Sequence, residues 1–399
     1  MRWLFCDPND PDEAAARKAV LEKIDAWWRV FPKKVDDLAA LFSRKAEWDL
    51  PQWMHDNLQA IDSRLMWEYG QAVKGPGHRL VITPESDRHL RPMVKTLLDR
   101  APVLPGWEFY PYRLSEALEE AEATVEGRAG EDISDWKAKV AAGQDHQIDI
   151  VYFSPRCSGK EDRKAFEAAF VSTESLLGEE VLDKWIGSIE AQPMPGKGAL
   201  GLFGKKEPPG TVRLDRLKPT VDSLIQSMKD QLPAEPVHTW CENCTWSALK
   251  LKPPELPEYP GRRDLFVATT ALPEMWRTAQ LGRHFAAERF SRCGETFCYI
   301  KIEHTEQFDG MDLDRRTAVE EALDDALKPP RLGGVCGTGT GRRYCYLDLA
   351  LTDPRKGIAA SLEVLRKAKA SPRSWILFFD DVLSDEWIGV YGDTPPPPE

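Results

Sequence analysis

The sequence has no long uninterrupted hydrophobic run, and this absence limits where the protein can act. No stretch approaches the roughly eighteen consecutive apolar residues that a membrane-spanning helix needs. The N-terminal residues turn acidic within a few positions and contain no apolar segment of signal-peptide length. We therefore expect a soluble chain that works in the cytoplasm.

Cysteine and positive charge are also in short supply. Eight cysteines are few for a chain whose 42% hydrophobic content can build a core, so we expect free thiols in a reducing compartment. Lysine and arginine number 53 against 65 aspartates and glutamates, which gives a formal net charge of −12. A field of this sign repels phosphate backbones and anionic lipid, so we expect neither nucleic acid nor a membrane as a partner.

The common catalytic signatures are missing from the sequence as well. The seven histidines are scattered and form no HExxH pair, and the segment around Ser158 lacks the frame of a nucleophile elbow. The glycine- and lysine-rich stretch 193–210 lacks the full Gly-x4-Gly-Lys-Ser/Thr phosphate loop. We therefore predict no catalytic and no cofactor-binding residue, and we favour a protein that is not an enzyme.

What the sequence does contain is a repeated strand-to-helix pattern. Four apolar, strand-like runs lead into a proline, and a helix-periodic segment follows each. Proline suits the first helical position, and Thr83, Ser154 and Asp353 are good N-cap types. In the first and last cases a tryptophan-led strand comes next, at 107–113 and 375–381, which predicts β-α-β units. The four runs are LVITPE (80–85), IVYFSPR (150–156), LFVATTALPE (265–274) and LDLALTDPR (347–355).

The order of the expected elements predicts the fold class. Three helices are expected between 12 and 72, and the acidic stretch 114–142 is expected to be helical with a break near 127–132. The C-terminal elements from 297 onward follow the order β-α-β-β-α-β-β, which contains that of a ferredoxin-like sandwich. The class is therefore α+β, with two α/β sandwich domains of mixed or antiparallel sheets, the C-terminal one ferredoxin-like, and an N-terminal helical segment.

The predicted domain boundary is the segment 193–210, which is dense in glycine, proline and lysine and has no clear period. It separates an N-terminal helical segment plus α/β domain, 1–192, from a C-terminal α/β domain, 211–392, whose ferredoxin-like core covers about 297–392. The segment 193–210 itself is expected to be a linker or loop. The tail 393–399, DTPPPPE, is expected to be disordered, polyproline-like coil.

Cysteine spacing supplies a zinc-site hypothesis. Cys241 and Cys244 have the C-x2-C spacing that can chelate zinc, and Cys293 with Cys298 offers a second, imperfect C-x4-C pair. His238 and His284 are spare ligands. The alternative is that these are buried free thiols, and we favour it because paired knuckles of matched spacing are the reliable zinc signature. We therefore predict no cofactor, with zinc as the alternative.

Two further segments have a functional and a structural interpretation. Glycines and arginines in GTGTGRR, 337–343, are able to cradle an anion, but a glycine run between two strands more often forms a hairpin turn. The acidic set near the C-terminus resembles a divalent-metal cluster for hydrolysis, but such side chains are usually solvated. The set comprises Asp380, Asp381, Asp385 and Glu386, with Asp348 on a nearby predicted strand.

The segment 333–391 resembles the uncharacterised bacterial family DUF695. The likeness is carried by GTGTGRRYCYLDLAL, by the helix after it, and by WILFFDDVLSDEWIGVY with its acidic turn. It covers about 60 residues and its motifs are structural. The resemblance implies a small ferredoxin-like regulatory module and brings no catalytic residues with it.

These observations together predict a bacterial, non-catalytic protein-interaction or regulatory module. One form of such a module is an immunity-type protein that binds a basic toxin or enzyme. Acidic charge, 14 tryptophans and no convergent catalytic set favour another protein as the partner. The alternatives are a metal-dependent hydrolase that uses the acidic cluster near Asp380 and Glu386, and a structural zinc protein built on Cys241 and Cys244. The oligomeric state is not predicted.

Overall fold

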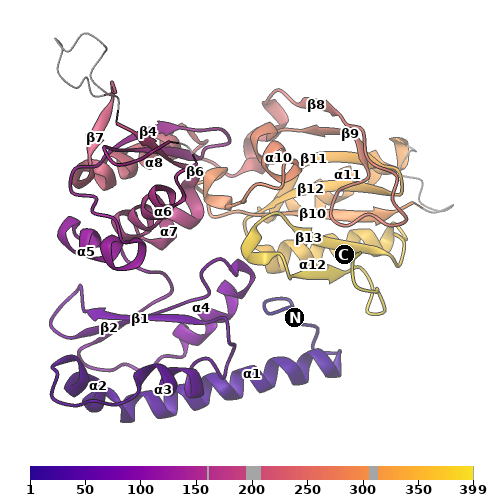
Figure 1. The fold of residues 1–399 in the computed structure, drawn as a ribbon. Helices are drawn as coiled ribbons and strands as arrows, with labels where there is room; N and C mark the ends of the chain where they lie inside the picture. Colours follow the sequence, from indigo (N-terminus) through magenta and orange to yellow (C-terminus); the bar gives the residue numbers. More distant parts are fainter. Residues whose placement is uncertain (160, 195–207, 305–312, 399) are drawn as a thin grey trace, which may run out of the picture. The chain divides into compact units, whose positions relative to one another are not determined.

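The structure is a computed structural model that describes residues 1–159, 161–194, 208–304 and 313–398. These residues form two compact units, Met1–Leu114 and Ser115–Glu399 (Figure 1). Both units combine helices with sheets, so the predicted α+β class is confirmed. None of the helices within the described ranges has both the length and the hydropathy that a bilayer crossing requires.

The first unit packs helices against a small sheet. Asp10 caps the first helix because its carboxylate accepts the N–H groups of Asp12 and Glu13, and Pro11 occupies the first helical position. The sheet order is β1-β2-β3, in which β2 and β3 are parallel and are connected through α4. This confirms the first predicted β-α-β unit. The elements are α1 (Pro11–Val30), α2 (Val35–Phe42), α3 (Leu50–Asn57), β1 (Met66–Gln71), β2 (His78–Thr83), α4 (Arg91–Asp99) and β3 (Trp107–Tyr110).

The expectation of helix up to residue 72 is wrong at its end, because Met66–Gln71 forms strand β1. The side chains of β1 alternate: Trp67 and Tyr69 pack against the helices, whereas Met66 is exposed. Burying two aromatic rings on one face of a strand stabilises this segment more than a helical turn with only one of them buried.

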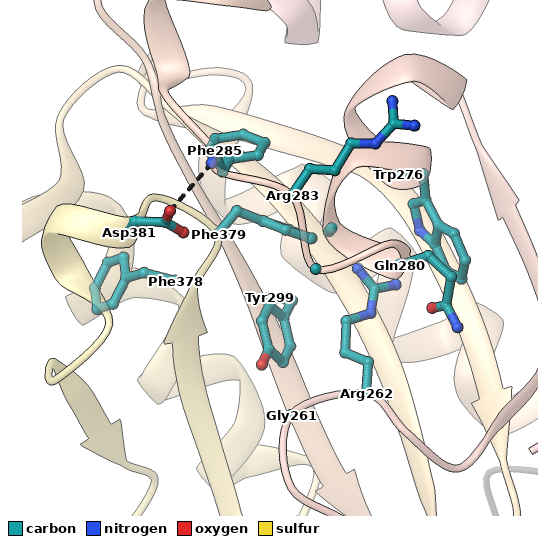
Figure 2. A pocket seen from close by; sticks show the side chains of 12 residues that line it. Gly261, Arg262, Trp276, Gln280, Arg283, Phe285, Tyr299, Phe378, Phe379 and Asp381 are labelled. Carbon is teal, nitrogen blue, oxygen red and sulfur yellow. Dashed lines mark hydrogen bonds between the residues drawn. The ribbon is translucent and has the colours of Figure 1, made fainter. Parts of the chain in front are cut away.

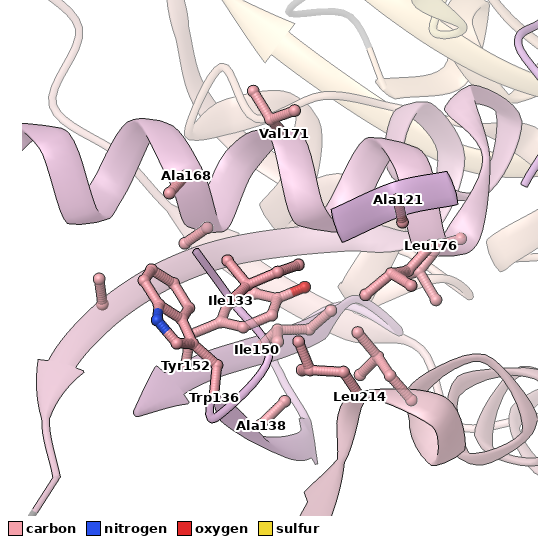
Figure 3. Close-up of a cluster of buried hydrophobic side chains, with 14 of the residues drawn as sticks. Ala121, Ile133, Trp136, Ala138, Ile150, Tyr152, Ala168, Val171, Leu176 and Leu214 are labelled. Atoms are coloured by element: carbon pink, nitrogen blue, oxygen red, sulfur yellow. The ribbon is translucent and has the colours of Figure 1, made fainter. Parts of the chain in front are cut away.

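The N-terminal layer of the second unit is a four-stranded mixed sheet with order β6-β5-β4-β7. Its core gathers Trp136, Ile150 and Tyr152 under the helix that carries Ala168 (Figure 3). Residues 137–142, expected to be helical, instead form β4 and pair antiparallel with β5. The elements are α5 (Leu118–Ala129), β4 (Lys137–Ala142), β5 (Ile148–Ser154), α6 (Arg163–Leu177), α7 (Glu179–Trp185), β6 (Ile186–Pro193), β7 (Thr211–Arg213) and α8 (Leu217–Gln231).

The C-terminal layer is a seven-stranded antiparallel sheet with order β14-β13-β10-β12-β11-β9-β8. Within it, β10-α11-β11-β12-α12-β13 has the spatial strand order of a ferredoxin-like sandwich, so that prediction is confirmed. The helices α11 and α12 pack against each other. The elements are α9 (Val237–Trp240), β8 (Ser247–Lys250), β9 (Leu265–Thr270), α10 (Pro273–Gln280), β10 (Thr296–Glu303), α11 (Leu313–Leu327), β11 (Gly333–Gly341), β12 (Tyr344–Leu351), α12 (Pro354–Lys367), β13 (Ser374–Phe378) and β14 (Trp387–Gly389).

The predicted role of proline at helix starts holds in two of the four runs. Pro273 and Pro354 begin α10 and α12, and Asp353 caps α12 through the Lys356 N–H. After β2 and β5 a loop intervenes, so the prolines at 84 and 155 do not begin the helices, and Asp162 rather than Ser154 caps α6.

Two predicted boundaries fall at the edge of the described residues. Most of the segment 193–210, namely 195–207, lies outside them, so the linker stays a prediction. The tail was expected to be disordered, but Thr394 is buried, and the carbonyl oxygen of Pro395 accepts a 2.6 Å hydrogen bond from the Trp375 indole. The chain is therefore tied to the C-terminal sheet as far as Pro395.

Candidate functional site

A pocket of about 240 Å³ lies between α10 and the face of the C-terminal sheet that carries Tyr299 (Figure 2). One wall is α10 with the loop after it, and the other is formed by β10 and the end of β13. The lining includes a run of aromatic rings and four polar side chains. The aromatic residues are Trp276, Phe285, Tyr299, Phe378 and Phe379, and the polar ones are Arg262, Gln280, Arg283 and Asp381.

Local sequence explains why α10 presents Trp276 to the sheet. Pro273 starts the helix, and Met275, Trp276 and Thr278 are its buried residues, so this face turns inward. The Trp276 indole N–H donates a 3.0 Å hydrogen bond to Asp348 on β12. The same strand face carries Tyr346 two residues earlier, since side chains alternate along a strand.

Arg262 and Asp348 form a buried ion pair behind the pocket wall. The guanidinium lies 3.1 Å and 3.2 Å from the two carboxylate oxygens, and the exposed fractions of the two side chains are 10% and 0%. Burial raises the pKa of Asp348, and Arg262 opposes that shift. The Arg262 guanidinium also lies 4.5 Å from the Trp276 ring and 5.1 Å from the Phe379 ring. Its charge is thus balanced before any ligand binds.

Asp381 is the carboxylate that lines the pocket, and it too is engaged. It accepts hydrogen bonds from His284 Nδ1 and, at 3.3 Å, from the Phe285 N–H (Figure 2). The negative charge of Asp381, together with those of Asp145 and Asp380, stabilises the positive charge of the fully buried Arg289. Two backbone N–H groups bind Asp380 next to it, yet burial of that carboxyl raises its pKa to about 6.

Three polar groups of the lining have no hydrogen-bond partner within the described residues. They are the hydroxyl of Tyr299, the side-chain amide of Gln280 and the Nε–H of Arg262, of which the last is buried. Tyr299 is only 7% exposed, and burial raises its pKa to about 12, so the hydroxyl keeps its proton. Buried polar groups normally have partners. The Arg262 Nε–H is closed off by burial, so the Tyr299 hydroxyl and the Gln280 amide are the groups that can donate hydrogen bonds to a bound molecule.

The mouth of the pocket is connected to the other layer of the second unit. Arg283 lies 3.2 Å from Asp145 Oδ2, and Arg277 donates a 2.6 Å hydrogen bond to Asp145 Oδ1. Asp145 stands in the turn between β4 and β5 and is 3% exposed. A second ion pair, 2.7 Å between Lys184 of α7 and Glu288, joins the same two layers.

The structure does not gather the cysteines predicted as zinc ligands. Cys241 and Cys244 share one turn, where their thiols point at the carbonyl oxygens of Val335 and Cys241. Cys293 lies near the carbonyl of Ala234, and Cys298 is fully buried in β10. Burial raises the pKa of Cys241 to about 11, which opposes the thiolate that zinc requires.

The spare ligands and the acidic set are also placed apart. His238 lies on α9, and His284 pairs with Asp381. Asp380 accepts hydrogen bonds from the N–H groups of Ala287 and Val382, Asp348 pairs with Arg262, Asp385 is exposed and Glu386 is 4% exposed. Across the part of the chain that the structure describes, no three His, Cys, Asp or Glu side chains form a group that could hold a metal ion.

The glycine run 337–341, expected to form a turn, is instead the second half of strand β11. It pairs with β12 and β9, and the hairpin turns at Arg342 and Arg343. A Cβ at Gly337 would come within 2.5 Å of Asp348 Oδ2, so glycine leaves the space that the buried carboxylate occupies. The run therefore holds the Arg262–Asp348 pair in place.

The pocket residues come from four separate segments of the chain, and the sequence alone did not single them out. In the sequence Arg262 stands next to Arg263 with nothing that marks it as buried, and Tyr299 and Phe379 lie in ordinary apolar runs. The usable signal was the proline-started helix with Trp276, because a tryptophan on a short helix after a strand must pack on the adjoining sheet.

Comparison with protein-family models, with curated proteins and with solved structures finds no match for the chain. The likeness of 333–391 to DUF695 therefore stays a prediction that depends on its own residues. The function has to be argued from the geometry of the pocket.

Proposed function

We propose that the chain is a non-catalytic regulatory module whose C-terminal layer binds a ligand in the pocket beside Tyr299. The observation that carries the proposal is the position of Arg283, which lines the pocket and pairs with Asp145 of the neighbouring layer. A ligand that displaces or orders Arg283 changes a contact between the two layers. Ligand binding in the pocket of the C-terminal layer is thus coupled to the Asp145 turn of the other layer. Regulation requires a coupling of this kind between two sites.

The chemistry of the lining also supports binding rather than catalysis. Arg262, Asp381 and Arg283 each have an ion-pair or hydrogen-bond partner outside the cavity, so their charges serve the fold. Two of the groups without partners in the described residues, the Tyr299 phenol and the Gln280 amide, can recognise a ligand by hydrogen bonding.

A pocket-filling variant tests this proposal. Ala279 of α10 lines the pocket, and Ala279→Phe adds a ring inside it; the control is Ala359→Phe, at an exposed position of α12. Binding of one- and two-ring aromatic fragments, measured by ligand-observed NMR, is expected to weaken at least tenfold in Ala279→Phe alone. Unchanged fragment binding in that variant, or chemical conversion of a bound fragment by the unmodified protein, would overturn the proposal.

The second candidate function is that of a protein-interaction module. It is favoured by Phe166 and Phe170, one turn apart on α6, which are 47% and 42% exposed, and by the net charge of −12. An apolar pair on an acidic protein suits a basic protein partner. The double variant Phe166→Ser, Phe170→Ser is then expected to lose a stoichiometric basic partner that the unmodified protein retains. Equal retention by both would count against it.

A further inference from the structure

The pocket has room for one small, flat molecule. Its volume of about 240 Å³ is below the roughly 300–1,000 Å³ of clefts that hold drug-sized ligands. Its walls are planar surfaces, because the rings of Trp276, Tyr299 and Phe379 meet the guanidinium plane of Arg262 (Figure 2). A one- or two-ring aromatic molecule fits such walls best, since rings stack on rings and on guanidinium groups.

The charges of the pocket exclude a charged ligand on energetic grounds. Arg262 is paired with Asp348 and Arg283 with Asp145, and Asp381 accepts two hydrogen bonds and lies in the field of the buried Arg289. A ligand carboxylate or ammonium would lose its hydration and find every counter-charge already in use. Burial of a charge without a free partner costs several kcal/mol in general.

The unpartnered groups set the remaining requirement. The Tyr299 side chain is 7% exposed, and its hydroxyl has no hydrogen-bond partner among the described residues. The hydroxyl lies beside Gly261, where an added Cβ would stand 3.9 Å from its oxygen. The Nε–H of Arg262 also lacks a partner, but it is closed off from the cavity by burial. The hydroxyl is a donor, so a ligand that binds it must present an acceptor oxygen or nitrogen.

We propose that the pocket binds an uncharged, flat aromatic molecule of one or two rings that carries a carbonyl-type acceptor, to which the Tyr299 hydroxyl donates a hydrogen bond. The inference rests on the proposed function, because it names the class of ligand for the same pocket. It adds that recognition works through hydrogen bonds to a neutral molecule and not through ion pairing.

Three probes of equal shape and different charge test the inference on the full chain. They are 2-naphthamide (neutral), 2-naphthoate (anionic) and 2-naphthamidine (cationic), and titration calorimetry gives their affinities. We expect the amide to bind at least tenfold more tightly than either charged probe. Tighter binding of a charged probe would overturn the ligand class and leave the proposed function standing.

Two tyrosine variants then test the contact itself. Tyr299→Phe removes only the hydroxyl, and the amide is expected to bind about three- to tenfold more weakly, as the loss of one hydrogen bond predicts. The matched control is Tyr344→Phe, which removes a hydroxyl from β12 outside the lining and should leave the affinity unchanged. Equal amide affinity for Tyr299→Phe and the unmodified protein would refute the contact.

The outcomes separate the two proposals. If none of the three naphthyl probes binds but other fragments do, and Ala279→Phe abolishes their binding, the ligand class is wrong while the regulatory site remains. If Ala279→Phe weakens the binding of no fragment at all, both the proposed function and the proposed ligand class fail.

Discussion

Lys301 is a charged side chain placed where charges are rarely found. It is fully buried on β10, donates a hydrogen bond to the Tyr259 carbonyl, and its ammonium lies 4.2 Å from the Tyr344 ring. Burial lowers its pKa to about 8, and Asp264 and Glu258 oppose that shift. The position two residues after Tyr299 places it on the same strand face as the pocket.

This burial predicts a pH dependence of stability. Between pH 8 and about 10.4, the ordinary lysine pKa, the unfolded chain holds the proton and the folded chain does not, so stability rises with pH. We therefore compare the free energy of unfolding of the unmodified protein with that of Lys301→Met. The difference, unmodified minus variant, should increase by up to about 3 kcal/mol from the lower to the upper end of this pH window. Urea unfolding at pH 7.5 and pH 10.5 measures the change.

An exposed lysine supplies the control for that experiment. Lys367 of α12 is exposed, so Lys367→Met should follow the unmodified protein at both pH values. If the difference between the unmodified protein and Lys301→Met were the same at both pH values, Lys301 would not be held in the environment described above.

Among the elements, those with strong local patterns were predictable from the sequence. The ferredoxin-like order followed from apolar strands that alternate with amphipathic helices, and Asp353 with Pro354 marked the start of α12. The prediction failed where local pattern and tertiary packing disagree. The run 337–341 was expected to be a turn but continues strand β11, and glycine stands at 337 because Asp348 occupies the space that a side chain there would need.

The pocket itself had no local sequence pattern to find. Arg262 precedes β9, Trp276 lies on α10, Tyr299 on β10 and Phe379 just after β13. These residues meet only because β13 and β10 are neighbours and α10 folds onto them, which is a property of topology and not of spacing. The cysteine pairs show the reverse case, since a suggestive spacing is divided among separate elements.

At the scale of the whole molecule, Asp145 joins the two layers of the second unit. Asp145 accepts charge-assisted hydrogen bonds from Arg277 and Arg283, and its backbone oxygen lies 3.5 Å from Arg289. It adopts a left-handed backbone conformation with φ of 56°, which asparagine also tolerates. The substitution Asp145→Asn therefore removes the charge and leaves the turn intact.

Loss of that charge is expected to loosen both layers at once. Asp145→Asn removes the counter-charge that Arg277 and Arg283 share, and because both arginines are more than a third exposed to solvent, the cost is about 1 kcal/mol. Hydrogen exchange followed by mass spectrometry should then show faster exchange in the β4–β5 turn and in residues 273–291 together, with the first unit as an internal reference. Asp149→Asn is the matched control, because Asp149 bonds to Ser188 inside one layer and should affect only that layer. Unchanged exchange in 273–291 of Asp145→Asn would show that the layers are held by other contacts, and the coupling on which the regulatory proposal depends would be lost.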